Sequence, residues 1–126
     1  MINRMLNHKH LYFSFHYAFA GIWYAVRFNQ NMRIHFTAAI LVLIAAYFLK
    51  VTGVEMAILG LLILLVIGAE MINTAIEEMV DLITKEHHEE AKVAKDVSAG
   101  MVLVTAIGAV IIGLFIFLPH VVSFFQ

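Results

Sequence analysis

The residues best suited to chemistry are polar side chains at helical spacing in the middle of the chain. At about 100° per residue, four of them fall on one stripe of a helix: Glu70, Asn73, Glu77 and Asp81. Glu70 and Glu77 would lie about 10 Å apart along the helix axis. The stretch before them, residues 56–67, is wholly apolar, so the stripe begins at or just inside a membrane boundary. A carboxylate at that depth is costly and marks a functional site.

The composition indicates an integral membrane protein. Of the 126 residues, 63% are hydrophobic and 13% are charged, and there is a single proline. A soluble chain of this length could not bury so much apolar surface. The formal net charge of −1 argues against a nucleic-acid partner, and the lack of cysteine excludes disulfides and thiolate chemistry.

Three charge-poor stretches predict three membrane spans in one domain covering residues 1–126. The first stretch is short for a span, but Arg33 and Lys50 at its ends can snorkel to the interfaces. The segment before it mixes aromatic and basic residues, which is typical of a helix at the level of the lipid headgroups. The expected fold is an all-α membrane protein, with an interfacial helix over about 4–29 and spans over 32–50, 55–84 and 91–119.

Glycine and proline predict the turns and the close contacts. Gly53 is expected to punctuate a tight turn between the first two spans. Gly60 and Gly68 are eight residues apart on one helix face, which suggests close helix packing. Pro119 is expected to end the last span.

Basic residues predict the orientation in the membrane. Only Lys50 lies between the first two spans. The other seven precede the first span or lie between the second and third: Arg4, Lys9, Arg27, Arg33, Lys85, Lys92 and Lys95. The positive-inside rule therefore places the N-terminus and the polar stripe on the cytoplasmic side, where nucleotides are found.

Carboxylates beside lysines at this boundary could hold a divalent cation and a polyphosphate. Mg²⁺ typically takes one or two carboxylates together with phosphate oxygens. Phosphoryl transfer then needs positioning, charge neutralisation and a base on the nucleophile. Lys92, Lys95 and Asp96, at the start of the third span, would meet the stripe. Because three spans alone enclose a site poorly, a homo-oligomer is expected.

Other interpretations compete with this one. The outer acids are better explained as an ion-paired helix end: Glu78, Glu86, Glu89 and Glu90. The histidine pairs at 8 and 10 and at 87 and 88 lack a convincing metal spacing. A non-enzymatic transporter or channel subunit could use Glu70 as an ion site. A transporter would more naturally carry its charge near the bilayer midplane.

The motifs resemble the prokaryotic diacylglycerol kinase family. Residues 70–77 read EMINTAIE and are followed by Val80-Asp81, and residues 91–96 read AKVAKD with small residues after them. Residues 31–35, NMRIH, are similar to the Gram-positive branch of that family. The resemblance implies a trimeric membrane kinase that uses MgATP to phosphorylate a lipid hydroxyl directly. The lipid is mostly undecaprenol in the Gram-positive branch and diacylglycerol in the Gram-negative branch, and nothing along the apolar helices distinguishes the two tails.

The resemblance also implies roles for single residues. Glu70 would be the general base on the lipid hydroxyl, Glu77 a Mg²⁺ ligand, and Asn73 a residue that helps to hold the site. The residues expected around the nucleotide are Tyr17, Glu77, Glu86, His87, His88, Lys95 and Asp96. Those expected near the lipid substrate are Asn31, Arg33, Glu70 and Ala99.

One position departs from the family pattern. Asn29 stands where the family usually carries a second metal-binding glutamate. An amide carbonyl can ligate Mg²⁺, but without charge, so Asn29 would be a weaker ligand. If Asn29 is a ligand, Asn29→Glu is expected to raise activity or to lower the Mg²⁺ requirement.

Overall fold

The computed structural model describes residues 8–86 and 88–126, and in these ranges it contains four α-helices and no strand. The helices are α1 (His8–Phe28), α2 (Gln30–Phe48), α3 (Gly53–Ile83) and α4 (Glu89–Phe124). The last three are long and apolar enough to cross a membrane. This confirms the predicted all-α membrane fold with three spans. Residues 4–7 of the predicted interfacial helix lie outside the described ranges.

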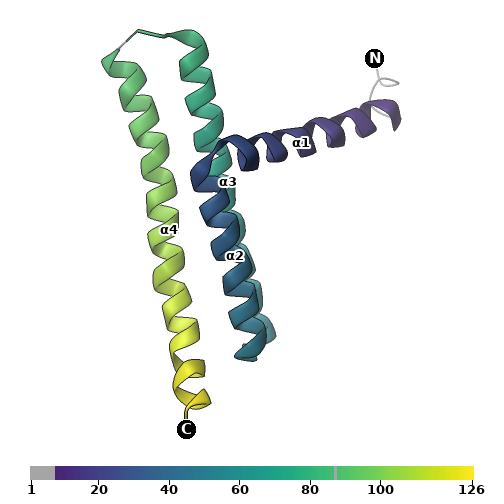
Figure 1. Cartoon of the computed structure of the whole chain (residues 1–126), viewed down its shortest axis with the longest axis vertical. Coiled ribbons are helices and arrows are strands. Elements are labelled where there is room, and N and C mark those ends of the chain that lie inside the picture. The colour runs from purple at the N-terminus through teal and green to yellow at the C-terminus, as the bar shows by residue number, and fades with distance from the viewer. Residues whose placement is uncertain (1–7, 87) are drawn as a thin grey trace.

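α3 is the central helix of the bundle, and it packs more extensively against α4 than against α2. α3 is 12 residues longer than α2 (31 against 19), which corresponds to about 18 Å. Only four residues separate the end of α2 from the start of α3, so the extra length must lie at the other end of α3. Figure 1 shows this arrangement, with the α3–α4 hairpin extending past α1. Residues from about Met71 onward therefore lie beyond the level at which α2 begins.

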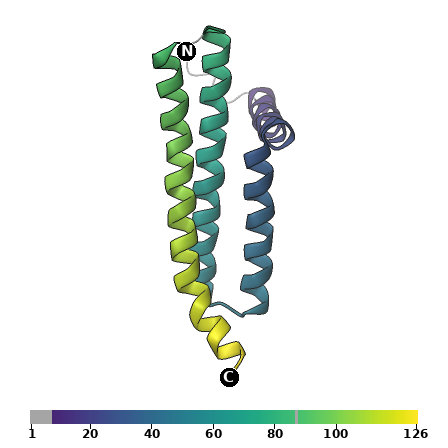
Figure 2. The same cartoon turned by 60° about the vertical axis from the view of Figure 1, so that its left-hand side comes forward.

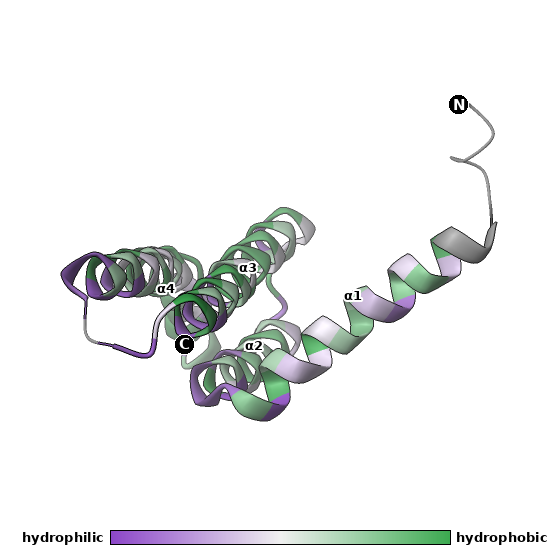
Figure 3. Cartoon of the chain, turned by 90° about the horizontal axis from the view of Figure 1, so that it is seen from above, coloured by the Kyte–Doolittle hydropathy of each residue, from purple (hydrophilic) through white to green (hydrophobic). Residues whose placement is uncertain are grey.

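α1 runs across the direction of the other three helices instead of along it (Figure 1). Seen from above, α2, α3 and α4 form a cluster and α1 leaves it (Figure 3). A single residue, Asn29, separates α1 from α2, and its backbone N–H still bonds the carbonyl of Ala25. This placement fits a helix that lies at the membrane surface while α2 enters the bilayer.

The turn between α2 and α3 differs from the predicted one. Gly53 is the first residue of α3, and the left-handed residue of the turn is Lys50, with φ of 53°. The N–H groups of Lys50 and Val51 bond the carbonyls of Tyr47 and Ala46, which is the Schellman pattern at a helix end. Thr52 then begins α3 with a capping box to Glu55. Because a capping box fixes the helix start, glycine is not needed for the turn.

The prediction that Pro119 ends the last span is wrong, because α4 continues through it to Phe124. Figure 2 shows the final turns of α4 bending away from the line of the helix. A proline inside a helix removes one hydrogen bond and bends the chain without necessarily stopping it. The residues after it are largely apolar, and in lipid a helix is the conformation that satisfies their backbone groups.

Gly60 and Gly68 do not pack closely within the chain. A Cβ atom added at either position would meet no atom of another element within 4 Å in the described structure. The same holds for Gly100, Gly108 and Gly113 on α4. The close helix contact suggested by the spacing of Gly60 and Gly68 is therefore not made among the helices as described.

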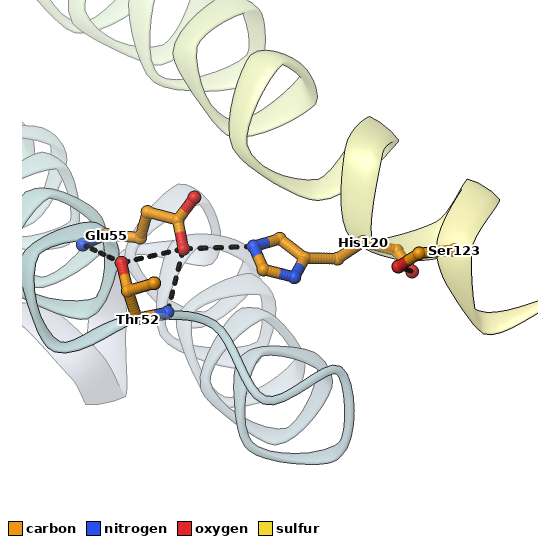
Figure 4. A network of polar contacts seen from close by, with 4 residues as sticks. All are labelled: Thr52, Glu55, His120 and Ser123. Atoms are coloured by element: carbon orange, nitrogen blue, oxygen red, sulfur yellow. Dashed lines mark hydrogen bonds and ion pairs between the residues drawn. The ribbon is translucent and has the colours of Figure 1, made fainter.

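A polar contact joins α3 to α4 at the end of the bundle opposite the hairpin. His120 Nε2 lies 2.9 Å from Glu55 Oε2, and Glu55 also accepts from the backbone N–H of Thr52 at 2.7 Å. Figure 4 shows the His120 ring reaching across to the Glu55 carboxylate. Beside it lies an apolar cluster made by Ala46, Leu59 and Ile116. This contact secures the segment of α4 that follows Pro119.

Replacing His120 by Ala is expected to lower the free energy of unfolding by about 1–2 kcal/mol, because the imidazole bonds a carboxylate in a half-buried position. Thermal unfolding in detergent would measure the change. Ser123→Ala, which removes only a bond to the backbone carbonyl of His120 on the same helix, is the control and should leave stability unchanged. Equal stability of the two variants would show that the contact contributes nothing.

Candidate active site

Glu70 is the first residue of the predicted stripe and is completely buried, with 0% of the residue exposed. Its Oε1 accepts a hydrogen bond from Asn29 Nδ2 at 2.8 Å. Its Oε2 has no hydrogen-bond partner among the residues that the structure describes. Burying a carboxylate oxygen without a partner is costly. An oxygen left in this state is suited to a hydrogen bond or proton from a ligand.

Asn29 comes from the junction between α1 and α2, which brings it level with Glu70. Its Oδ1 caps α2 by accepting from the backbone N–H groups of Asn31 and Met32. Its Nδ2 donates to Glu70 and also to Thr74 Oγ1, at 2.7 Å. Thr74 in turn donates to the backbone carbonyl of Glu70. The buried carboxylate on α3 is thus held by the residue that caps α2.

Asn73 joins Glu77 to α4 through a second buried network. Asn73 is 3% exposed, and its Nδ2 donates to Glu77 Oε1 at 3.0 Å. Its Oδ1 accepts from the hydroxyl of Ser98, which is 4% exposed, at 2.7 Å. Ser98 also lies 2.9 Å from the carbonyl of Lys95. These bonds fix the rotation of α3 against α4 where the hairpin leaves the bilayer.

Farther along the hairpin, the chain carries a polar pocket between α3 and α4. Lys95 bonds Asp81 across the two helices. The pocket is also lined by Lys85, Lys92 and Asp96. Seen from above, hydrophilic residues gather at this connected end of the two helices (Figure 3). The three lysines share this solvent-open pocket with three acids, Asp81, Glu86 and Asp96, so a polyphosphate could pair with the lysines although the formal charges balance.

The structure brings some of the predicted nucleotide residues together. Glu86, His88, Lys95 and Asp96 all line the polar pocket. Glu86 Oε2 lies 3.9 Å from His88 Nε2. His87 lies outside the described residues. Tyr17 is exposed and stacks on Phe13 within α1, which leads away from the hairpin (Figure 1), so one chain does not bring Tyr17 to this pocket.

The predicted lipid residues lie around the membrane end of the site. Asn31 and Arg33 are exposed in the first turn of α2, and Arg33 donates to the carbonyl of Arg27. Ala99 is exposed on α4, next to the buried Ser98. An apolar groove between α2, α3 and α4 runs below them, with His35 and Ile67 among its lining residues. Ile67 is one helical turn from Glu70, so this end of the groove lies near the buried carboxylate, which does not itself line the groove in the described structure.

Three residues contribute to the site although they were not among the predicted ones. Thr74 follows Glu70 by four residues on the same stripe, a signal that was present in the spacing. Ser98 falls among the small residues that follow residues 91–96, and nothing in that pattern marks it as a partner of Asn73. Tyr24 donates to Glu78 Oε1 at 2.7 Å and so ties α1 to α3, and this bond to a carboxylate raises the pKa of the Tyr24 phenol. Glu78 is therefore a docking point for α1, which the spacing of charges could not show.

Ser98→Ala tests the buried network between α3 and α4. The change leaves Asn73 Oδ1 buried without its partner, and we expect the free energy of unfolding to fall by about 1–3 kcal/mol. Thermal unfolding in detergent measures this, with Ala99→Ser on the exposed neighbouring position as the control. If Ser98→Ala unfolds at the temperature of the unmodified protein, the network does not stabilise the hairpin.

Comparisons with known proteins agree on one family. The family profile described as prokaryotic diacylglycerol kinase matches residues 16–117. The undecaprenol kinase of Bacillus subtilis is 47% identical over 106 residues, which cover 84% of this chain and 86% of that protein. A diacylglycerol kinase of Synechocystis is 44% identical over 87% of this chain and 63% of its own length. The diacylglycerol kinase of Escherichia coli K12 is 38% identical over 59% of this chain and 61% of that protein.

Proposed function

Because this chain belongs to the prokaryotic diacylglycerol kinase family, we propose that it transfers the γ-phosphate of MgATP to the hydroxyl of undecaprenol. The chain is an integral-membrane lipid kinase. The observation that carries the chemistry is the buried Glu70, whose Oε2 lacks a partner within the described residues. It lies level with the junction of α1 and α2, where a lipid headgroup would lie.

In this reaction Glu70 Oε2 accepts the proton of the lipid hydroxyl. The hydroxyl oxygen attacks the γ-phosphorus, a new O–P bond forms, and the bond from phosphorus to the β–γ bridging oxygen breaks. ADP leaves with that oxygen, and the proton remains on Glu70 until it passes to water. The apolar groove below Glu70 would hold the chain of the lipid with its hydroxyl at the carboxylate. The protein thus supplies a base and a fixed position for the nucleophile.

Glu77 is the residue that we propose for Mg²⁺. Within residues 8–86 and 88–126, no cluster of three acidic or histidine side chains could form a metal cage by itself. A single carboxylate, held in place by Asn73, is enough for a Mg²⁺ ion whose other ligands are phosphate oxygens and water. The bound ion would neutralise phosphate charge as the γ-phosphoryl group moves. Lys95 and Asp96, with Glu86 and His88, would surround the nucleotide in the polar pocket.

We prefer undecaprenol over diacylglycerol because the Bacillus subtilis undecaprenol kinase is 47% identical to this chain over most of both proteins. The match to the Bacillus subtilis undecaprenol kinase covers 86% of that protein, whereas the match to the Synechocystis diacylglycerol kinase covers 63%. Asn31, Arg33 and Ala99 would lie near the lipid substrate. A transporter or channel is not favoured, because the relatives are named kinases.

We also propose that the active unit is a homotrimer with its sites on the cytoplasmic side. The glycine faces on α3 and α4 are open in one chain and would accept a helix of a second copy. A neighbouring copy could also bring Tyr17 to the nucleotide, which its own chain does not. Arg27, Arg33 and the lysines of the hairpin favour the cytoplasm for this end, with Lys50 outside.

The experiment is phosphate transfer from labelled ATP by the purified protein in mixed micelles with Mg²⁺. Undecaprenol and diacylglycerol are supplied separately, and Glu70→Ala is the control. Labelled undecaprenyl phosphate that disappears in the variant supports the proposal. Label on diacylglycerol alone would keep the mechanism and overturn the substrate. No label on either lipid, from a folded and oligomeric sample, would overturn the kinase assignment.

A further inference from the structure

The side chain of Asn29 uses all of its hydrogen-bonding groups. Its Oδ1 accepts from the backbone N–H groups of Asn31 at 2.8 Å and Met32 at 3.3 Å. Its two Nδ2 protons go to Glu70 Oε1 at 2.8 Å and Thr74 Oγ1 at 2.7 Å. Because the oxygen must face the start of α2 to cap it, the nitrogen must face Glu70. The amide therefore has one orientation, fixed by the backbone.

This arrangement makes the two oxygens of Glu70 unequal. Oε1 is held by the Asn29 amide, whereas Oε2 finds no partner in the described part of the chain. We propose that Asn29 is a positioning residue, whose amide binds Glu70 Oε1 so that Oε2 alone faces the lipid hydroxyl. The inference rests on the proposed function, because it assigns Glu70 as the base.

The same geometry weighs against Asn29 as a metal ligand. Both acceptor positions of Oδ1 are engaged by backbone N–H groups, and an amide nitrogen does not bind Mg²⁺. Glu77, the proposed ligand, lies two helical turns beyond Glu70, or about 10 Å along α3. A carboxylate at position 29 would instead face the Glu70 carboxylate. If Asn29 positions Glu70, an acid at position 29 should therefore lower kinase activity. If Asn29 binds the metal, the same acid should raise it.

Two substitutions at position 29 separate capping from positioning. Asn, Asp and Ser cap helices about equally well, so Asn29→Asp and Asn29→Ser both keep the start of α2. Asp replaces the amide donors by a carboxylate oxygen against Glu70, and Ser removes the donors without adding charge. Both variants are compared with the unmodified protein for thermal unfolding and oligomer size before kinetics are measured.

We expect Asn29→Asp to lower kcat about 100-fold and Asn29→Ser about 10-fold, because the base is no longer held in place. The KM for MgATP and the Mg²⁺ concentration for half-maximal rate should stay within about twofold, because neither the nucleotide pocket nor Glu77, the proposed metal ligand, is touched. If Asn29→Asp fails to fold, the kcat of Asn29→Ser alone tests the proposal. Unchanged kcat in Asn29→Ser would overturn the proposal, as would a lower Mg²⁺ requirement in Asn29→Asp.

A double variant shows whether Asn29 acts through Glu70. In a Glu70→Gln background, Asn29→Ser should leave the residual rate unchanged, because the base that it positions is already gone. A further tenfold loss would show that Asn29 acts independently of Glu70 and would overturn the inference. Full activity of Glu70→Gln alone would instead overturn Glu70 as the base, and no transfer to either lipid by the unmodified protein would overturn the proposed function, so these failures are distinguishable.

Discussion

Glu70→Gln is expected to lower kcat by about 10³-fold, since a positioned general base contributes about 10²–10⁴-fold. The glutamine side chain has nearly the same shape, and its carbonyl can still accept the Asn29 hydrogen bond. It cannot accept the proton of the lipid hydroxyl. Transfer of label from ATP to undecaprenol in mixed micelles measures the loss, with KM for MgATP determined in parallel.

The matched control for Glu70→Gln is Glu78→Gln. Glu78 lies two turns farther along α3, is exposed and accepts a hydrogen bond from Tyr24 of α1. The same chemical change there should keep kcat within about threefold, because no proton is transferred at that position. If the two variants lose activity equally, the buried carboxylate is not the base and the loss reflects charge on α3 in general.

Glu77→Gln is expected to act on the nucleotide side of the site. Removing a charge that faces the metal and phosphates should lower kcat/KM for MgATP by about 10²-fold and raise the half-saturating Mg²⁺ concentration at least about tenfold. Its amide oxygen can still accept from Asn73, so the link to α4 is retained. Initial rates across a Mg²⁺ series at fixed ATP measure both quantities.

Two comparisons show whether the effect of Glu77→Gln is confined to the metal and the nucleotide. The KM for the lipid should stay unchanged in Glu77→Gln, because the base and the apolar groove lie on the other side of Asn73. Glu90→Gln, an exposed acid in the first turn of α4, should leave the Mg²⁺ dependence as it is. A Glu77 variant with unchanged Mg²⁺ dependence would remove this residue from the proposed metal site.

The polar stripe and the spans could be predicted because both follow from local periodicity. A run of apolar residues long enough to cross a bilayer leaves helix as the stable conformation, and the helix repeat then places Glu70, Asn73 and Glu77 on one face. The same local reasoning gave too much weight to the conformational preferences of two single residues. Gly53 and Pro119 carry strong local preferences, but a capping box and the surrounding lipid decided the outcome at each.

Partners across helices could not be predicted in the same way. Which side chain of α2 or α4 meets the stripe depends on the height and rotation of those helices relative to α3. The short turn after Lys50 sets the height, and buried contacts such as Ser98 with Asn73 set the rotation. A shift of one residue in the height or the rotation of α2 or α4 would present different side chains to the stripe on α3.

Three membrane spans with a row of acids at one boundary could be predicted from the order of residues alone, because helix formation and membrane insertion depend on residues near one another in the chain. Its motifs also indicated the kinase family that the comparisons then showed. The tertiary structure decided that Asn29 caps α2 and at the same time holds Glu70. Forty-one positions separate these two residues, and only the packing of α2 against α3 brings their side chains within hydrogen-bonding distance.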